Sequence, residues 1–199
     1  MNALEVVNRN LFLQLNAGEQ TGAGMISTAT FIADVLIYLI PLALVMVWLW
    51  LPERRQLALR AFLVCCIALG IGQVLALLWP HPRPFMIGLG HTWMPHAAVA
   101  SFPSDHGIVF ASMACCLLLA GELALGGLTA IMGIAVAWSR IFLGVHFPLD
   151  MLGALGVSLF AYLLLLPVWA RWGSPFMQAM EKLYRYLLAW PITKGWIRP

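Results

Sequence analysis

Long apolar stretches separated by short polar loops dominate this sequence. About 30 Å of hydrocarbon is crossed by a helix of roughly 18 or more apolar residues. The predicted spans cover about residues 25–51, 57–79, 106–120, 123–142 and 149–169. In lipid, every backbone polar group needs a partner inside the protein. The pattern therefore predicts an all-α fold, a polytopic transmembrane bundle with five spans.

Amphipathic segments flank the spans at both ends of the chain. Residues 2–16 place Leu4, Val7, Leu11 and Leu15 at helical spacing, with Asn2 as a candidate N-cap. After residue 173, apolar residues again follow this spacing while charged residues occupy the other face. Both segments are predicted to be helices on the membrane surface. With no internal repeat, residues 1–199 are predicted to form a single membrane domain.

Composition supports this assignment and excludes other classes. Hydrophobic residues make up 62% of the chain and charged residues 10%, whereas soluble domains carry roughly 25% charged residues. The net charge is +3 and no basic tract is interleaved with aromatics, so no nucleic-acid partner is expected. The four cysteines form two adjacent pairs in apolar runs and are expected to pack as small hydrophobes.

The basic residues indicate how the chain is oriented. If the polar hairpin at 52–56 faces the cytoplasm, eight of the eleven Lys and Arg residues do so too. The positive-inside rule then places the loops at 80–105 and 140–148 outside. The three exceptions are Arg9, Arg83 and Arg140, and the last two lie in those outer loops.

All five histidines lie in or beside the same two loops, and none lies within a span. They are His81, His91, His96, His106 and His146. The end of the second span, the start of the third and the junction of the fourth and fifth share one membrane face. Three segments that are distant in the sequence are therefore predicted to build one pocket.

The first segment is Ser139-Arg140, five residues, His146, three residues, then Asp150. Pro148 suits the first turn of a helix, which puts His146 at its start and Asp150 about one turn on. A carboxylate there can accept a hydrogen bond from one imidazole nitrogen. The other nitrogen is then free to attack phosphorus.

The second segment, residues 102–107, is a Pro-Ser-x-His turn that opens into an apolar helix. Unpaired backbone N–H groups at a helix N-terminus suit a phosphate. Ser104 can add a hydroxyl and Asp105 its backbone N–H, while His106 can protonate a departing oxygen as general acid.

The third segment is His81-Pro82-Arg83-Pro84, in which prolines stiffen the backbone around Arg83. Its guanidinium can bind phosphate oxygens in bidentate fashion. Together with Arg140 it would neutralise the charge of a transferring phosphoryl group, as a metal ion does in many other enzymes.

Together these segments resemble the three signatures of the type 2 phosphatidic-acid phosphatase superfamily, in order and in spacing, across residues 76–150. The resemblance implies a helical-bundle phosphatase that works through a phosphohistidine without metal or other cofactor. It implies His146 as nucleophile, Asp150 as its partner and His106 as acid. The phosphate-binding residues would be Arg83, Ser104, Asp105 and Arg140.

Within the superfamily, the short chain, the Phe-Pro-Ser-Asp-His form and the external site most resemble bacterial undecaprenyl-diphosphate phosphatases. This implies a polyprenyl diphosphate substrate and a site on the outer face of the bacterial cytoplasmic membrane. The product would be the monophosphate carrier lipid of cell-wall synthesis, recycled for peptidoglycan biosynthesis.

Two positions depart from the superfamily pattern. Ala76 stands where the first signature usually opens with Lys, seven residues before its Arg, and His81 is a candidate partial substitute. Asp105 stands where Gly is more common. Because a carboxylate would repel phosphate, the Asp105 side chain is expected to turn away from the site.

Other interpretations stay open at this stage. The chain could pass the phosphoryl group to another lipid, act on phosphatidic acid or phosphatidylglycerol phosphate, or bind or transport a lipid phosphate without turnover. A histidine metal site has little support, because the spacings fit no familiar zinc pattern.

Several polar residues have less defined expected roles. His81, His91 and His96 are expected mainly at the membrane interface, where each could touch substrate. Asp34, inside the first span, is either functional or bonded within the bundle to Gln73 or a hydroxyl.

Overall fold

The computed structural model describes residues 3–199, a range that excludes the candidate N-cap Asn2. The described chain is helical and contains no strand. Its main helices are α1 (Ala3–Leu15), α2 (Ala23–Val35), α3 (Leu39–Trp50), α4 (Arg55–Leu78), α5 (Asp105–Leu119), α6 (Leu123–Phe142), α7 (Pro148–Leu187) and α8 (Ala189–Thr193). Short 3₁₀ turns lie at Leu36–Tyr38, Pro52–Arg54 and Pro84–Ile87.

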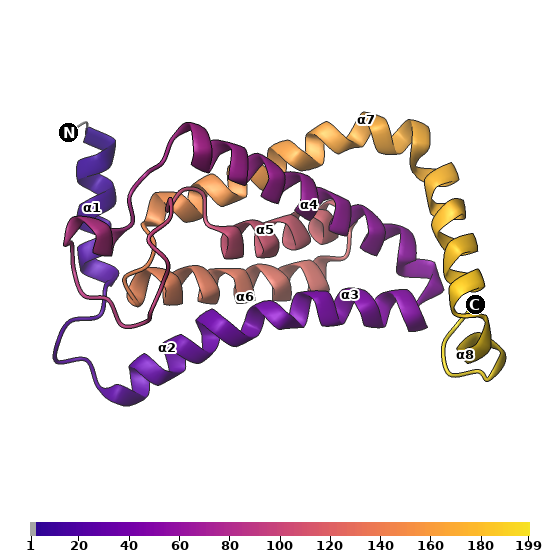
Figure 1. The fold of residues 1–199 in the computed structure, drawn as a ribbon, viewed down its shortest axis with the longest axis horizontal. Helices are drawn as coiled ribbons and strands as arrows, with labels where there is room; N and C mark the ends of the chain where they lie inside the picture. The colour runs from indigo at the N-terminus through magenta and orange to yellow at the C-terminus, as the bar shows by residue number, and fades with distance from the viewer. Residues whose placement is uncertain (1–2) are drawn as a thin grey trace.

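Four of the five predicted spans are helices long and apolar enough to cross a membrane: Ala23–Trp50, Pro52–Leu78, Leu123–Phe142 and Pro148–Leu187. The predicted third span, α5, has only 15 residues and a length of about 22 Å, less than the hydrocarbon thickness. It lies in the middle of the bundle, with α4, α6 and α7 packed around it (Figure 1). α5 is therefore the central helix of the bundle and the shortest of the five predicted spans.

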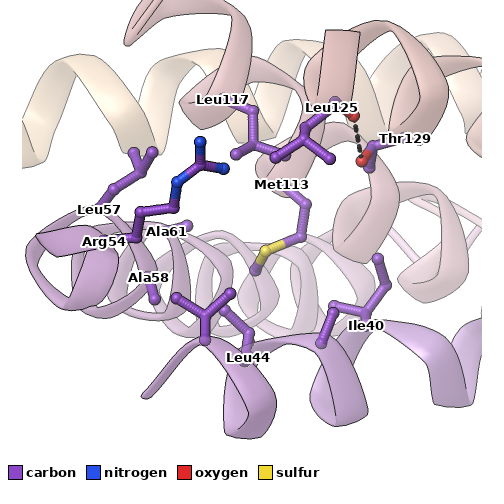
Figure 2. Close-up of a pocket in the computed structure, with 12 residues that line it drawn as sticks. Ile40, Leu44, Arg54, Leu57, Ala58, Ala61, Met113, Leu117, Leu125 and Thr129 are labelled. Carbon is purple, nitrogen blue, oxygen red and sulfur yellow. Dashed lines mark hydrogen bonds between the residues drawn. The ribbon is translucent and has the colours of Figure 1, made fainter. Parts of the chain in front are cut away.

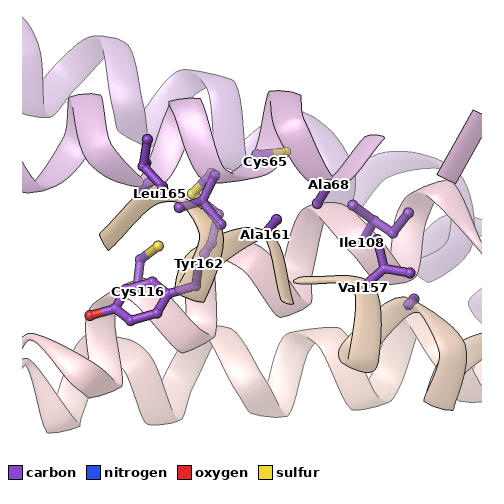
Figure 3. Packing of buried hydrophobic residues seen from close by; sticks show 12 residues of the cluster. Cys65, Ala68, Ile108, Cys116, Val157, Ala161, Tyr162 and Leu165 are labelled. Carbon is purple, nitrogen blue, oxygen red and sulfur yellow. The ribbon is translucent and has the colours of Figure 1, made fainter. Parts of the chain in front are cut away.

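The core between α4, α5 and α7 is built largely from small side chains. Ala61, Ala68, Ala154 and Ala161 are almost fully buried there, which lets the helix backbones approach closely (Figure 3). The cysteines pack as expected in three cases. Cys65 and Cys116 belong to this core, Cys115 is also buried and Cys66 is exposed, and all four thiols are free.

The second surface helix is not a separate element. Residues 148–187 form the single helix α7, which runs through Gly173 without a break, so the predicted end near residue 169 was wrong. Pro167 and Pro175 lie inside α7, and prolines in membrane helices are tolerated where neighbouring groups satisfy the backbone. α7 bends in its second half, which then runs across the end of the bundle (Figure 1).

α1 crosses the opposite end of the bundle, close to the loop that follows α4 and to the turn between α6 and α7 (Figure 1). Asn8 and Phe12 are buried against the bundle, and Asn8 accepts a hydrogen bond from the Leu149 N–H at 3.1 Å. The predicted apolar residues, such as Leu4 and Val7, are exposed on the surface of α1. This arrangement matches an amphipathic helix lying on the membrane surface.

Candidate active site

Hydrogen bonds fasten the two predicted outer loops to one another. The Asn16 side chain donates to the carbonyls of His91 at 2.9 Å and Phe142 at 3.0 Å. Gly144 has φ of 83°, and a Cβ there would lie 2.1 Å from the His91 carbonyl oxygen, so only glycine fits this turn. The loops meet at one end of the bundle, as the topology predicted.

His146 lies in the turn between α6 and α7 and is 2% exposed. Its Nδ1 is 3.1 Å from Asp150 Oδ2, so the predicted contact is present. Because a carboxylate only accepts hydrogen bonds, Nδ1 carries the proton and Nε2 keeps its lone pair. Burial lowers the pKa of His146 to about 4 against the opposing hydrogen bond and charge of Asp150. The imidazole is therefore neutral at neutral pH, with Nε2 as a nucleophile.

Ser101 completes this arrangement, although no sequence motif pointed to it. It is fully buried, and its hydroxyl donates to Asp150 Oδ2 while lying 3.3 Å from His146 Nδ1. The Phe147 N–H donates to the same carboxylate oxygen at 2.8 Å. Asp150 is thus held by three donors, which stabilise its charge and fix the plane of the imidazole.

Arg83 is held mainly by the protein itself. Its guanidinium donates to the carbonyls of Val99 at 3.0 Å, Ala100 at 3.1 Å and Val145 at 2.9 Å. Its Nη1 also donates to His146 Nε2 at 3.0 Å. Four of the five guanidinium N–H groups are therefore in use. The predicted bidentate contact with a phosphate would require one of these hydrogen bonds to open.

Arg140, at the end of α6, is in a different situation. It is 3% exposed, and Nη2 donates to His96 Nε2 at 2.9 Å. Its Nε is buried and has no hydrogen-bond partner within residues 3–199. A buried donor of this kind needs an acceptor, and a phosphate oxygen would supply one.

His96 is the second site residue without a predicted role. Its ring centroid lies 6.2 Å from that of His146. Its Nδ1 lies 3.1 Å from the Ala97 carbonyl, so Nδ1 carries the proton and Nε2 accepts from Arg140. Burial, followed by the neighbouring arginine charges, lowers the pKa of His96. Arg83–His146 and Arg140–His96 are thus two neighbouring arginine–histidine pairs.

The start of α5 forms another part of the site. Ser104 caps the helix and accepts the Gly107 N–H at 3.3 Å, and its O–H remains available as a donor. Asp105 accepts a hydrogen bond from Gln73 on α4 at 3.1 Å. Burial raises the pKa of Asp105 while the charges of Arg83 and Arg140 oppose this rise, so the carboxylate stays within electrostatic reach of the site rather than turning fully away. His106 lies in the first turn of α5, half-buried, with no hydrogen bond to its side chain in the described chain.

The structure also places Asp34, His81 and His91, whose expected roles were less defined. Asp34 is exposed on α2. This helix packs mainly against α6, and Gln73 of α4 binds Asp105 instead of Asp34. The Asp34 carboxylate lies close enough to Arg140 for their charges to interact. His81 Nε2 lies 3.6 Å from Glu5 of α1, in a cavity of about 430 Å³ that Asp150 also lines. It is His96, not His81, that lies beside Arg140. The His91 ring is exposed and lies beside Trp93, with ring centroids 6.4 Å apart, while Asn16 anchors its main chain.

Comparisons with known proteins identify the family. The family model described as the PAP2 superfamily matches residues 57–174. The chain is 40% identical over 196 residues to the putative undecaprenyl-diphosphatase YbjG of Escherichia coli, covering 98% of this chain and 99% of the relative. It is 31% identical over 154 residues to the undecaprenyl-diphosphatase BcrC of Bacillus subtilis, covering 77% of this chain and 79% of BcrC.

A solved structure shares the fold. The crystal structure of Aquifex aeolicus LpxE superposes with a TM-score of 0.68 at 22% identity, covering 81% of this chain and 95% of LpxE. At that identity the likeness concerns the fold alone.

Proposed function

The chain belongs to the PAP2 superfamily, and we propose that it is a multi-pass membrane phosphatase that hydrolyses undecaprenyl diphosphate to the monophosphate. Undecaprenyl-diphosphatase is the activity named for both bacterial relatives. The observation that carries the proposal is the buried His146, whose Nδ1 faces a carboxylate and whose Nε2 faces a guanidinium. A neutral imidazole in this setting is a nucleophile suited to phosphorus.

In the first step, His146 Nε2 attacks the terminal phosphorus and the bond from phosphorus to the bridging oxygen breaks. Arg83 Nη1 must leave Nε2 for this attack, and a phosphate oxygen is the natural new acceptor for its N–H. Arg140, the Ser104 hydroxyl and the Asp105 N–H bind the other oxygens. Burial lowers the pKa of His106 to about 3, so the negative charge of the bound diphosphate must raise it for His106 to be protonated. His106 then gives this proton to the bridging oxygen, which departs with the lipid monophosphate.

In the second step, water attacks the phosphohistidine and releases inorganic phosphate. His106, now neutral, takes a proton from that water as it attacks. Asp150 stabilises the positive charge that the imidazole carries while it is phosphorylated. The sum of both steps is one water consumed and one phosphate released, with His146 and His106 restored.

The same proposal places the site on the outer face of the bacterial cytoplasmic membrane. The positive-inside rule supports this orientation, since eight of the eleven Lys and Arg residues are predicted to lie at the other end of the bundle. A cysteine introduced at His91 should be labelled by an impermeant reagent from outside. Labelling only from the cytoplasmic side would reverse the orientation.

Purified protein in detergent should release phosphate from undecaprenyl diphosphate in the presence of a chelator. His146→Ala should abolish both release and the acid-labile phosphoprotein, since it removes the imidazole that is phosphorylated. Full activity in this variant would refute the mechanism. Adding an acceptor lipid would show whether phosphate goes to water or to lipid.

A further inference from the structure

An apolar groove of about 330 Å³ runs along α5, between α6 and α7. It exists because α6 and α7 each pack closely on α5 but scarcely on one another. Small residues form its floor and one side, with Gly107 and Ala111 on α5 and Ala130 and Ala137 on α6. Larger side chains in these places would fill it.

The rim of this groove faces the lipid. Ile134 of α6 is 69% exposed, and Leu152 and Leu155 of α7 are 63% and 42% exposed. In a membrane these side chains contact hydrocarbon. A hydrocarbon chain can therefore enter from the side without crossing water or breaking a hydrogen bond.

One end of the groove lies at the active site. Gly107 directly follows His106, Met151 directly follows Asp150, and Ala137 lies about one turn before Arg140. A lipid whose diphosphate reaches His146 would thus have its first carbons at the mouth of the groove. From Gly107 to Leu118 the groove follows α5 for roughly 16 Å.

We propose that this groove binds the first isoprenoid units of the substrate chain, next to the diphosphate. The assignment rests on the proposed function, and it identifies the part of the protein that recognises the lipid.

The apolar cavity shown in Figure 2 is not an alternative for this role. It has a volume of about 180 Å³ and lies among α3, α4, α5 and α6. The α5 residue that lines it first, Met113, is about two turns beyond His106. Arg54 at this cavity faces Glu122 at 3.5 Å, at the end of the bundle away from the site.

Substrates of different chain length test the groove. Dimethylallyl diphosphate carries one isoprenoid unit and farnesyl diphosphate carries three. Ala130 lies toward the end of the groove away from the site, so Ala130→Leu should obstruct only the longer chain. We expect kcat/KM for farnesyl diphosphate to fall about tenfold, while the value for dimethylallyl diphosphate stays within about twofold.

Two further variants keep the result interpretable. Ile134→Ala removes an exposed rim contact without endangering folding, and should lower the farnesyl to dimethylallyl ratio in the same direction. Ala43→Leu makes the same change as Ala130→Leu in the Figure 2 cavity and should leave the ratio unchanged.

The outcomes separate the two proposals. Turnover of both substrates with an unchanged ratio in Ala130→Leu and Ile134→Ala would overturn the groove assignment and leave the phosphatase proposal standing. A wild-type protein that hydrolysed no prenyl diphosphate would overturn both.

Discussion

The two arginine–histidine pairs of the site share one hydrogen bond but differ in the other groups that they contact. In each pair a guanidinium N–H donates to an imidazole Nε2, at 3.0 Å for Arg83 and His146 and at 2.9 Å for Arg140 and His96. His146 then meets the Asp150 carboxylate, whereas His96 meets only the main-chain carbonyl of Ala97. Arg83 has most of its donors satisfied by protein carbonyls, whereas the buried Nε of Arg140 has no hydrogen-bond partner among the described residues.

This difference assigns the two pairs different tasks. A carboxylate beside Nδ1 stabilises positive charge on the ring, so only His146 is equipped to become a phosphohistidine. A buried donor without an acceptor is costly until a ligand supplies one, so the Arg140 pair is suited to binding phosphate. One pair performs the chemistry and the other holds the group that is transferred.

The strongest test of this division is Asp150→Asn, which keeps the shape and removes the charge. The neutral amide no longer stabilises a cationic phosphoimidazole, so kcat should fall about a thousand-fold or more. The phosphoenzyme formed in a single turnover should fall with it, as measured by rapid quench. Glu122→Gln, which removes a carboxylate at the far end of the bundle, is the matched control and should keep wild-type activity. An Asp150→Asn variant with near-normal kcat would show that His146 needs no carboxylate.

A smaller loss, of another kind, is expected from Arg140→Lys. Lysine keeps the charge but lacks the planar set of donors that includes Nε. KM should rise about ten- to a hundred-fold, with a smaller change in kcat, and inhibition by inorganic phosphate should weaken in parallel. Arg54→Lys makes the same exchange away from the site and should change neither quantity. Unchanged phosphate inhibition in Arg140→Lys would contradict the binding role of this pair.

The fold was largely predictable from the sequence, because the thickness and apolarity of the bilayer determine the length and hydropathy of a spanning helix. The predicted boundaries of α2–α3 and α4 lie within a few residues of those observed. α7 was predicted to end too early, because Gly173 and Pro175 interrupt the pattern while the helix continues through them. Whether a helix continues through such residues depends on tertiary packing, and local helix propensity does not predict that packing.

The site was predictable only where its residues occur at motif spacings. His146 and Asp150 are one helical turn apart, so their contact could be read from the sequence. Ser101 and His96 lie in the irregular loop after α4, where no periodicity fixes the direction of a side chain. Their roles arise from the path of that loop, which Arg83 anchors through the carbonyls of Val99 and Ala100.

The smallest expected effect concerns Ser101, whose hydroxyl contacts Asp150 and His146 of the Arg83–His146 pair. The attacking imidazole must be neutral, so activity should fall as the pH drops through the pKa of His146, about 4. In Ser101→Ala the Asp150 carboxylate loses a donor that disperses its charge, and it attracts the Nδ1 proton more strongly. The pKa of His146 should rise, and the acidic limb of kcat/KM, which reports the free enzyme, should move to higher pH by up to about one unit. Loss of one charge-assisted hydrogen bond should also lower kcat about tenfold at neutral pH.

Ser112→Ala removes another fully buried serine, one that bonds to Ser158 in the core, and should leave the pH profile in place. A profile for Ser101→Ala that stayed fixed, or moved to lower pH, would mean that this hydroxyl fills space beside the pair without setting its charge.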